Sequence, residues 1–320
     1  MRLLFFLLMV LIVSGCSKDP DEIPYQKINV PVITTFRDIE KLDDGSLVLC
    51  GGVDQMGIVM KSIDNGTNWL VSQTKFDNPV NALYFLSSDT GFAADADILI
   101  YRTTDGGMNW EPFYASSWPL TVNRNLRDIT FLNDSLGVVC GGKNYGNGVV
   151  YTSSNKGDSW SFTEYEHELR SVCFTDAMNG VICGYSTLMV THDGGATFTK
   201  KEEPKDFFTG VVKDFSGKLW MCAFNGNIYS SINQGENWNK VRETNSWNTS
   251  VNQLNCIDIS PLGKIACAGP NGFIVWSTDG GANWNERLSF DGNDILQLEW
   301  NSENELFAVG KNGGVYKIGI

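Results

Sequence analysis

Short runs of alternating apolar and polar residues fill the chain after its first apolar segment. One stretch shows the pattern clearly: LRDITFL at 126–132, SLGVVCGG at 135–142, GVVYTSS at 148–154 and WSFTEY at 160–165. A period of two predicts β-strands that bury one face, and the Gly, Asn, Asp and Ser residues between the runs predict tight turns. We therefore expect a repeating unit of four strands, named A to D here, and no amphipathic helix after the N-terminal apolar run.

An eight-residue motif recurs six times, each time between the third and fourth runs of a unit. The copies begin at residues 62, 103, 153, 191, 231 and 277, which places them 41, 50, 38, 40 and 46 residues apart. Spacings near 40 to 50 residues that hold four short strands are typical of propeller blades. The octet has Ser or Thr first, Asp or Asn third, Gly fifth and Trp or Phe eighth. The third, fifth and eighth positions are Asp64, Gly66, Trp69, Asp105, Gly107, Trp110, Asn155, Gly157, Trp160, Asp193, Gly195, Phe198, Asn233, Gly235, Trp238, Asp279, Gly281 and Trp284.

Each recurring position of the octet has a physical role. The Asp or Asn side chain accepts hydrogen bonds from N–H groups of the turn, and Gly permits the positive φ that a hairpin turn often needs. The hydroxyl closes the same turn, and the aromatic ring anchors it between sheets. The octet resembles the Asp-box of sialidases, xyloglucan hydrolases, sortilin-type receptors and photosystem II assembly-factor propellers. The resemblance implies a structural box and does not name a function.

Seven blades are expected from the strand count. Six octets mark six blades, and residues 295–320 supply three further strands. We expect the fourth strand of this last blade from KINVPVI, Lys27–Ile33, which would close the ring and remove exposed sheet edges. The predicted fold is an all-β, seven-bladed propeller over residues 27–320. The resemblance implies that D-to-A and B-to-C connections share the ligand-binding face, opposite the octets.

The N-terminus carries the features of a lipoprotein signal. Arg2 precedes an apolar run at 3–13, which is too short to span a bilayer. The following VSGC resembles a lipobox, so we expect a signal peptide at 1–15 and a lipid on Cys16. Residues 16–26 are polar, acidic and proline-containing, as in a flexible tether. By resemblance to the sorting rules of Gram-negative lipoproteins, Ser17 after the cysteine favours the outer membrane, and the acidic stretch at 18–22 resembles a surface-export signal.

Charge and cysteine spacing exclude several classes of partner. The net charge of −13 argues against nucleic acid, because phosphate binding needs clustered Lys and Arg. Five cysteines recur near the end of strand B, where a small buried side chain fits, and their spacing is not that of a zinc site. Disulfides between Cys173 and Cys183, or between Cys256 and Cys267, stay open as an alternative. These five cysteines are Cys50, Cys140, Cys183, Cys222 and Cys267. We expect no metal and no cofactor.

Candidate ligand-binding residues lie at the start of strand A. Aligning the strands gives one position in all seven blades, expected at the mouth of the central channel, and arginines occupy three of these places. Three arginines in an acidic protein suit the binding of a carboxylate. The alternative is that Arg37 and Arg127 pair with the adjacent Asp38 and Asp128. The aligned residues are Arg37, Asn81, Arg127, Arg170, Thr209, Asn255 and Leu296.

Two other groups of residues are weaker candidates. Trp118 and Trp247 lie in the enlarged D-to-A loops 114–125 and 243–253, where they suit stacking on a sugar or contact with a peptide; packing over a blade edge is the alternative. The expected loop 164–170 contains Tyr165 and His167 among glutamates, and with Arg37 these are the candidates for acid–base chemistry. A solvated acidic turn is the competing interpretation.

Three functions follow from these features. The first is a non-catalytic propeller, anchored by lipid at the cell envelope, that binds proteins during assembly, as in the assembly-factor propellers it resembles. The second is a surface glycan-binding lipoprotein. The third is a carbohydrate-active enzyme of sialidase or lyase type, which is disfavoured because Phe36–Ile39 lacks the proline of the sialidase Arg-Ile-Pro motif.

Overall fold

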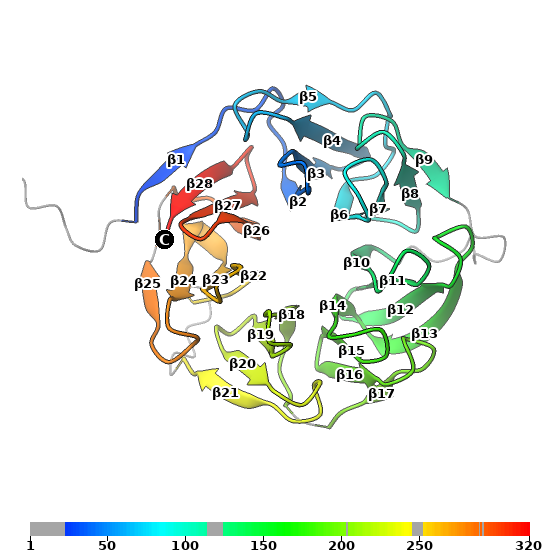
Figure 1. The fold of residues 1–320 in the computed structure, drawn as a ribbon, viewed down its shortest axis with the longest axis vertical. Coiled ribbons are helices and arrows are strands. Elements are labelled where there is room, and N and C mark those ends of the chain that lie inside the picture. The colour runs from blue at the N-terminus through cyan, green and yellow to red at the C-terminus, as the bar shows by residue number, and fades with distance from the viewer. Residues whose placement is uncertain (1–22, 114–123, 203, 245–251, 288, 290) are drawn as a thin grey trace, which may run out of the picture.

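The structure, a computed structural model, describes residues 23–113, 124–202, 204–244, 252–287, 289 and 291–320. These residues form seven four-stranded antiparallel sheets around a central channel, as Figure 1 shows. The predicted all-β, seven-bladed propeller is confirmed. Helix in the described residues is limited to one 3₁₀ turn, Pro270–Gly272, and no described helix has the length and apolar character needed to cross a membrane.

The blades follow one another along the chain, with strand A against the channel and strand D at the rim. Blades 1 to 3 consist of β2 (Phe36–Lys41), β3 (Leu47–Val53), β4 (Met56–Ser62), β5 (Leu70–Val71); β6 (Val80–Phe85), β7 (Gly91–Asp95), β8 (Ile100–Thr103), β9 (Glu111–Phe113); β10 (Leu126–Phe131), β11 (Gly137–Lys143), β12 (Gly146–Ser153), β13 (Ser161–His167). Blades 4 to 6 consist of β14 (Leu169–Phe174), β15 (Gly180–Gly184), β16 (Thr187–Thr191), β17 (Thr199–Lys200); β18 (Phe208–Lys213), β19 (Leu219–Ala223), β20 (Ile228–Ser231), β21 (Asn239–Arg242); β22 (Cys256–Ile259), β23 (Ile265–Ala268), β24 (Ile274–Ser277), β25 (Asn285–Arg287). Blade 7 consists of β26 (Ile295–Ser302), β27 (Glu305–Gly310), β28 (Val315–Gly319) and β1 (Tyr25–Lys27).

Blade 7 is completed by the N-terminal strand, which pairs antiparallel with β28. The strand lies at Tyr25–Lys27, earlier than the expected Lys27–Ile33, and only the Ile28 N–H continues the ladder, donating to the Val315 carbonyl at 2.8 Å. Ile23 is buried in the core of blade 7, so the propeller begins before residue 27. Pro31, which lacks an N–H, lies in the segment where the pairing has ended.

The core lies between blades rather than inside any one of them. Strands B and C are buried on both faces because each blade is covered by its two neighbours, whereas the D strands are largely exposed. One cluster joins Phe92 of blade 2 to Ile129 and Trp160 of blade 3, and each blade boundary has its equivalent. Stability therefore depends on closing the whole ring.

The octets form the C-to-D turns with one repeated set of hydrogen bonds. In blade 1 the Gly66 N–H donates to the Ser62 hydroxyl at 2.8 Å, and the Asn68 N–H donates to the Asp64 carboxylate at 2.8 Å. The Trp69 indole N–H donates to the Gly66 carbonyl at 3.1 Å, and Gly66 has φ of 81°. The Gly-to-hydroxyl bond recurs in the other five octets at Gly107, Gly157, Gly195, Gly235 and Gly281.

The cysteines of strand B serve as small core residues. All five are fully buried, as are the corresponding Ala94 and Ala308. Every cysteine in the described residues is a free thiol, so the alternative of disulfides between strands A and B is wrong in this structure. The pairing explains it: Cys183 lies opposite Ser171, while Cys173 lies opposite Val181.

Candidate functional site

A cavity of about 790 Å³ occupies the centre of the ring and is lined by strand A of every blade. The seven residues aligned in the sequence analysis all line it. They lie at the end of the channel where D-to-A connections enter and B-to-C turns come close. The octets lie at the opposite end of each blade, since they connect strands C and D.

Asp38 and Asp128 link neighbouring blades instead of pairing with the arginines beside them. Asp38 accepts the N–H of Leu83 in blade 2 at 2.7 Å. Asp128 accepts the N–H of Val172 in blade 4 at 2.8 Å and the hydroxyl of Ser171 at 2.9 Å. Pairing of Arg37 and Arg127 with these aspartates is therefore not the arrangement that the structure shows. The carboxylates hold adjacent blades together.

The polar, uncharged residues at the aligned position also link neighbouring blades. Asn81, Thr209 and Asn255 each donate to a backbone carbonyl of the next blade. The acceptors are Leu126, Leu254 and Ile295, at 2.6, 3.0 and 2.7 Å. Of the four remaining places on this ring, one is held by Leu296 and three are held by arginines.

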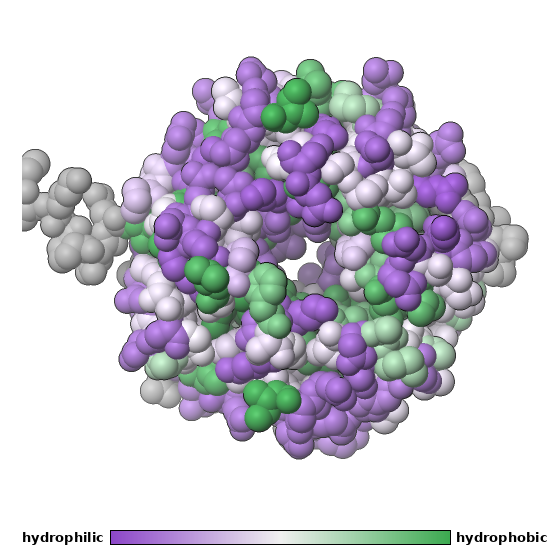
Figure 2. Space-filling view, in the orientation of Figure 1, coloured by the Kyte–Doolittle hydropathy of each residue, from purple (hydrophilic) through white to green (hydrophobic). Residues whose placement is uncertain are grey.

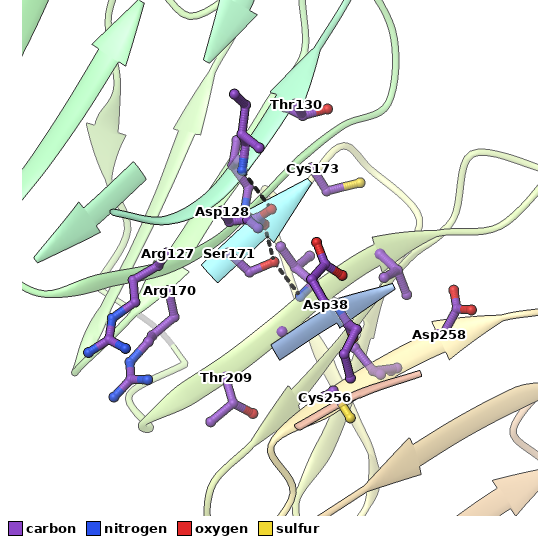
Figure 3. A pocket seen from close by; sticks show the side chains of 18 of the residues that line it. Asp38, Arg127, Asp128, Thr130, Arg170, Ser171, Cys173, Thr209, Cys256 and Asp258 are labelled. Carbon is purple, nitrogen blue, oxygen red and sulfur yellow. Dashed lines mark hydrogen bonds between the residues drawn. The ribbon is translucent and has the colours of Figure 1, made fainter. Parts of the chain in front are cut away.

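Arg127 and Arg170 are held together by one buried glutamate, Glu168. Its Oε1 lies 3.0 Å from Arg127 Nη2 and 2.8 Å from Arg170 Nε, and only 2% of its side chain is exposed. Its other oxygen accepts the N–H of Tyr145 at 2.9 Å. Figure 3 shows the two guanidinium groups side by side, pointing away from Asp128 and Thr130. One carboxylate therefore fixes two cations and leaves a net positive charge at the channel mouth.

Arg37 adds a third cation, and we call Arg37, Arg127 and Arg170 the arginine mouth. Burial, together with repulsion from Arg170 and Arg37, lowers the pKa of Arg127 to about 10. Burial also lowers the pKa of Arg37. The buried Nε atoms of Arg37, Arg127 and Arg170 make no hydrogen bond of good geometry, although that of Arg170 lies 2.8 Å from Glu168 Oε1 as an ion pair. An anion at the mouth would relieve this repulsion.

An aromatic surface adjoins the arginine mouth, and sequence reasoning missed it. We call it the aromatic wall: Tyr145, Tyr185, Phe207 and Phe224, from blades 3, 4 and 5. Neighbouring ring centroids are 4.9 to 5.4 Å apart, and the Arg170 guanidinium lies 5.3 Å from the centroid of Phe207. Tyr145 is 58% exposed. A weak signal existed, because Tyr185 and Phe224 each follow a strand-B cysteine by two residues.

The segment 164–170 is not a loop. It is the end of β13 and the start of β14, joined by the single residue Glu168. The His167 ring lies 6.3 Å from that of Tyr185, at the outer end of the aromatic wall, and its Nε2 is 3.8 Å from Glu166. Tyr165 packs on the core between blades 3 and 4, and burial raises its pKa. Glu168, in the same segment, is the residue that contacts both Arg127 and Arg170.

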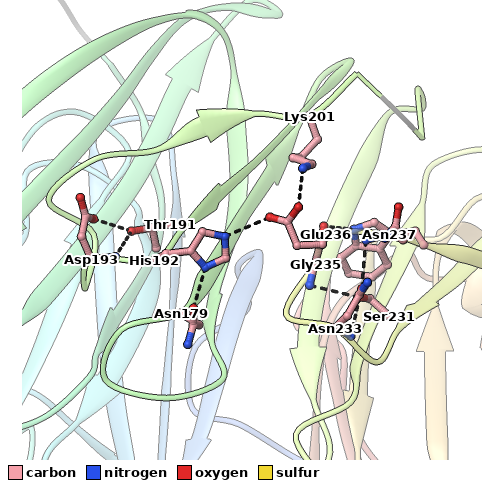
Figure 4. Close-up of polar contacts among 11 residues, drawn as sticks. Asn179, Thr191, His192, Asp193, Lys201, Ser231, Asn233, Gly235, Glu236 and Asn237 are labelled. Carbon is pink, nitrogen blue, oxygen red and sulfur yellow. Dashed lines mark hydrogen bonds and ion pairs between the residues drawn. The ribbon is translucent and has the colours of Figure 1, made fainter.

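The remaining sequence candidates lie elsewhere. Trp118 and Trp247 fall outside the described residues. His192, within the fourth octet, has its Nδ1 2.6 Å from Asn179 Oδ1 and its Nε2 3.0 Å from Glu236 Oε1, as drawn in Figure 4. Lys201 also contacts Glu236, at 2.7 Å. This network links the octet turns of blades 4 and 5. Among the described residues, no group of three or more His, Cys, Asp and Glu side chains is placed to hold a metal.

Deeper in the channel several carboxylates lie close together: Asp38 is buried, and the half-buried ones are Glu40, Asp128, Asp258 and Glu299. Burial raises the pKa of Asp38 and Asp258 to about 7 and that of Asp128 to about 6, partly opposed by backbone N–H donors. Burial and repulsion between neighbours also raise the pKa of Glu40 and Glu299 well above the usual value. The channel thus runs from a cationic mouth to an acidic interior.

Curated proteins with similar sequences are photosystem II assembly lipoproteins named Ycf48. The one from Prochlorococcus marinus (strain MIT 9312) is 22% identical over 292 residues, covering 75% of this chain and 84% of the relative. The one from Synechococcus sp. (strain CC9902) is 23% identical over 303 residues, covering 88% and 85%. No protein-family model matches the chain.

Solved propellers superimpose on almost the whole chain. YCF48 bound to a D1 peptide gives a TM-score of 0.72 at 20% identity, covering 94% of this chain and 96% of that one. YCF48 from Cyanidioschyzon merolae gives 0.71 at 16% identity, covering 92% and 98%. Virginiamycin B lyase from Staphylococcus aureus gives 0.72 at 13% identity, covering 93% and 100%. At such identities, what these proteins share with this chain is the propeller fold.

Proposed function

We propose that this protein is a non-catalytic propeller of Asp-box type that binds a segment of a partner polypeptide, as an assembly module anchored by lipid at the cell envelope. The observation that carries the proposal is the arginine mouth beside the aromatic wall. Support comes from the similar assembly lipoproteins, and from YCF48, which holds a D1 peptide in one of its solved structures.

The geometry suits a peptide that ends in, or contains, a carboxylate next to an apolar residue. Arg127 and Arg170 are positioned by Glu168 and retain donors for a second carboxylate. The wall offers aromatic faces to an adjacent apolar or proline side chain, with Tyr145 exposed for contact. Because the arginines are fixed before binding, little side-chain entropy would be lost.

An array of random peptides tests this proposal. Each peptide is presented once with a free C-terminal carboxylate and once amidated, and binding of the fluorescent protein is measured. We expect acidic or free-carboxylate peptides to bind, and Arg127→Gln with Arg170→Gln to weaken binding about 10-fold or more. The matched control is Arg102→Gln, which removes an arginine paired with Asp158 on the octet side of blade 2.

Two results would contradict peptide binding at this site. One is equal binding of the Arg127→Gln, Arg170→Gln protein and its parent. The other is retardation in polysaccharide gels that disappears in Trp118→Ala and Trp247→Ala, which would favour the glycan-binding alternative.

The anchor is a separate part of the proposal. It supposes cleavage before Cys16, a lipid on that residue, and an outer-membrane or surface-exposed location. Mass spectrometry of the N-terminal peptide from purified membranes should show the acyl groups on Cys16. An N-terminal peptide without them would refute the anchor and leave peptide binding untouched.

A further inference from the structure

The face opposite the arginine mouth carries exposed apolar residues in an uneven distribution. Three successive A-to-B turns, in blades 4, 5 and 6, present Met178, Phe215 and Leu262, which are 52%, 80% and 82% exposed. Ile232, in the octet of blade 5, is 81% exposed. We call these four residues the apolar arc. In Figure 2 apolar surface, drawn green, lies beside the channel opening over the inner strands of blades 5 and 6.

Equivalent turns in other blades are polar at their tips. The A-to-B turns of blades 1, 2, 3 and 7 present Asp43, Ser88, Asp134 and Glu303. Polar residues are expected there, because turn tips are solvated and favour Asp, Asn, Ser and Gly. Large apolar side chains in three neighbouring turns therefore depart from the usual polar composition of turn tips, and the propeller fold does not require them.

Lysines flank the arc although the protein as a whole is acidic. Lys213 and Lys218 lie on either side of Phe215 in sequence, and Lys264 follows Leu262 by two residues. Carboxylates stand in the same turns, with Asp176 two residues before Met178 and Asp214 directly before Phe215, so charges of both signs border the arc. What suits this surface to the interface of a bilayer is therefore its large exposed apolar side chains.

The N-terminal segment leaves the propeller on this same face. The Gly319 N–H donates to the Pro24 carbonyl at 2.9 Å, and Arg287 of blade 6 donates to the Ile23 carbonyl at 2.7 Å. Figure 1 shows β1 starting beside the C-terminus. Pro24 and Gly319 thus lie at the end of blade 7 where its A-to-B turn is found, because Gly319 pairs with Glu305.

Hydrogen bonds connect this exit point to the arc. The Leu262 N–H donates to Glu303 in the blade 7 turn at 2.7 Å. Lys264 donates to the Ile320 carbonyl at 2.9 Å. The turn that carries Leu262 is therefore directly attached to the turn and the chain end beside Pro24.

The segment between Cys16 and Ile23 is short. Its seven steps reach at most about 25 Å, whereas a domain of this length is roughly 50 Å across. A lipid on Cys16 would hold the propeller by the face or edge from which the segment leaves, and the far face would stay away from the bilayer.

We infer that the apolar arc docks on the lipid bilayer, with Phe215 and Leu262 entering the headgroup region, so that the arginine mouth faces away from the membrane. The inference rests on the anchor in the proposed function and adds an orientation to it. The docked face would explain why the apolar turns form one continuous run in blades 4, 5 and 6, of which blade 6 adjoins the tether.

Quenching by brominated lipid tests the orientation. The full-length lipidated protein carrying Phe215→Trp is reconstituted into vesicles of phosphatidylethanolamine and phosphatidylglycerol with brominated acyl chains. We expect the added emission to be quenched about two-fold or more. Asp134→Trp, in the equivalent turn of blade 3, and Asn312→Trp, in the B-to-C turn of blade 7, are the matched controls and should be quenched far less.

Quenching at position 215 no greater than at position 312 would overturn the inference. Mass spectrometry of Cys16 on the same sample separates the two proposals. If lipid is present and position 215 is unquenched, the anchor stands and the docking face is wrong. If lipid is absent, quenching at position 215 still reports contact of the arc with added vesicles.

Discussion

Aspartates in the octet turns and aspartates in the channel both accept hydrogen bonds from backbone N–H groups, yet their pKa values are shifted in opposite directions. In the octets, hydrogen bonds in an exposed turn lower the pKa of Asp193 and Asp279 to about 2. In the channel, burial raises the pKa of Asp38 to about 7 despite two N–H donors. Hydration decides the sign, because desolvation of a buried carboxylate outweighs the donors it gains.

The two regions also differ in how far along the chain their hydrogen bonds reach. An octet completes its hydrogen bonds within eight residues, so it is a self-contained turn. A channel carboxylate reaches about 45 residues along the chain to the next blade, as Asp38 does to Leu83. The octets thus shape each blade, whereas the channel residues join blades to one another.

The largest expected effect is the loss of a buried octet anchor. Trp110 is 4% exposed and packs against Phe76 and Phe85. Trp110→Ala should lower the free energy of unfolding by about 3–5 kcal/mol, because it leaves a cavity between blades. Urea denaturation measures the change. Trp284→Ala, at a half-buried anchor, is the control, and an equal loss there would show that burial between blades is not what matters.

A smaller effect is expected from Glu168→Gln at the channel mouth. The substitution removes the charge shared by Arg127 and Arg170, and we expect a loss of about 2–3 kcal/mol. Because Glu168 positions both arginines before a peptide binds, affinity for acidic peptides should fall together with stability. Calorimetric unfolding and peptide titration measure the two quantities. Tighter peptide binding by the variant would contradict this role and would show that Glu168 competes with the peptide for the arginines.

The smallest effect is on pH dependence, and it tests the comparison directly. The unfolded chain ionises its aspartates near pH 4, whereas the folded channel holds protons on Asp38 and Asp258 up to about pH 7. The folded state binds more protons between these values, so stability should fall as pH rises from 4 to 7.

Asp38→Asn should flatten this dependence, as followed by urea unfolding at a series of pH values. Asp279→Asn should leave it unchanged, because the folded pKa of Asp279, about 2, lies below the window. The octet aspartates act at lower pH, where their contribution is lost as pH falls through about 2 to 4. If Asp38→Asn kept the pH dependence of the parent protein, the channel aspartates would not be its cause.

Sequence alone determined the seven blades, the positions of the octets and the ring of residues at the channel. These follow from alternation, from turn chemistry and from the repeat, all of which act over a few residues. The same reasoning placed Arg127 and Arg170 on one ring but not their partner. The sequence predicts a loop at Tyr165 and His167, because acidic residues interrupt the alternation there. In the structure both residues belong to strand β13.

Tertiary structure alone decided what those ring residues contact. Glu168 lies between two arginines because blades 3 and 4 meet there, and the aromatic wall comes from turns of three blades. Likewise, only the tertiary structure places the apolar arc on the face from which the N-terminal segment leaves. Such contacts join residues tens of positions apart, and their burial and hydration depend on closing the ring, which no local pattern specifies.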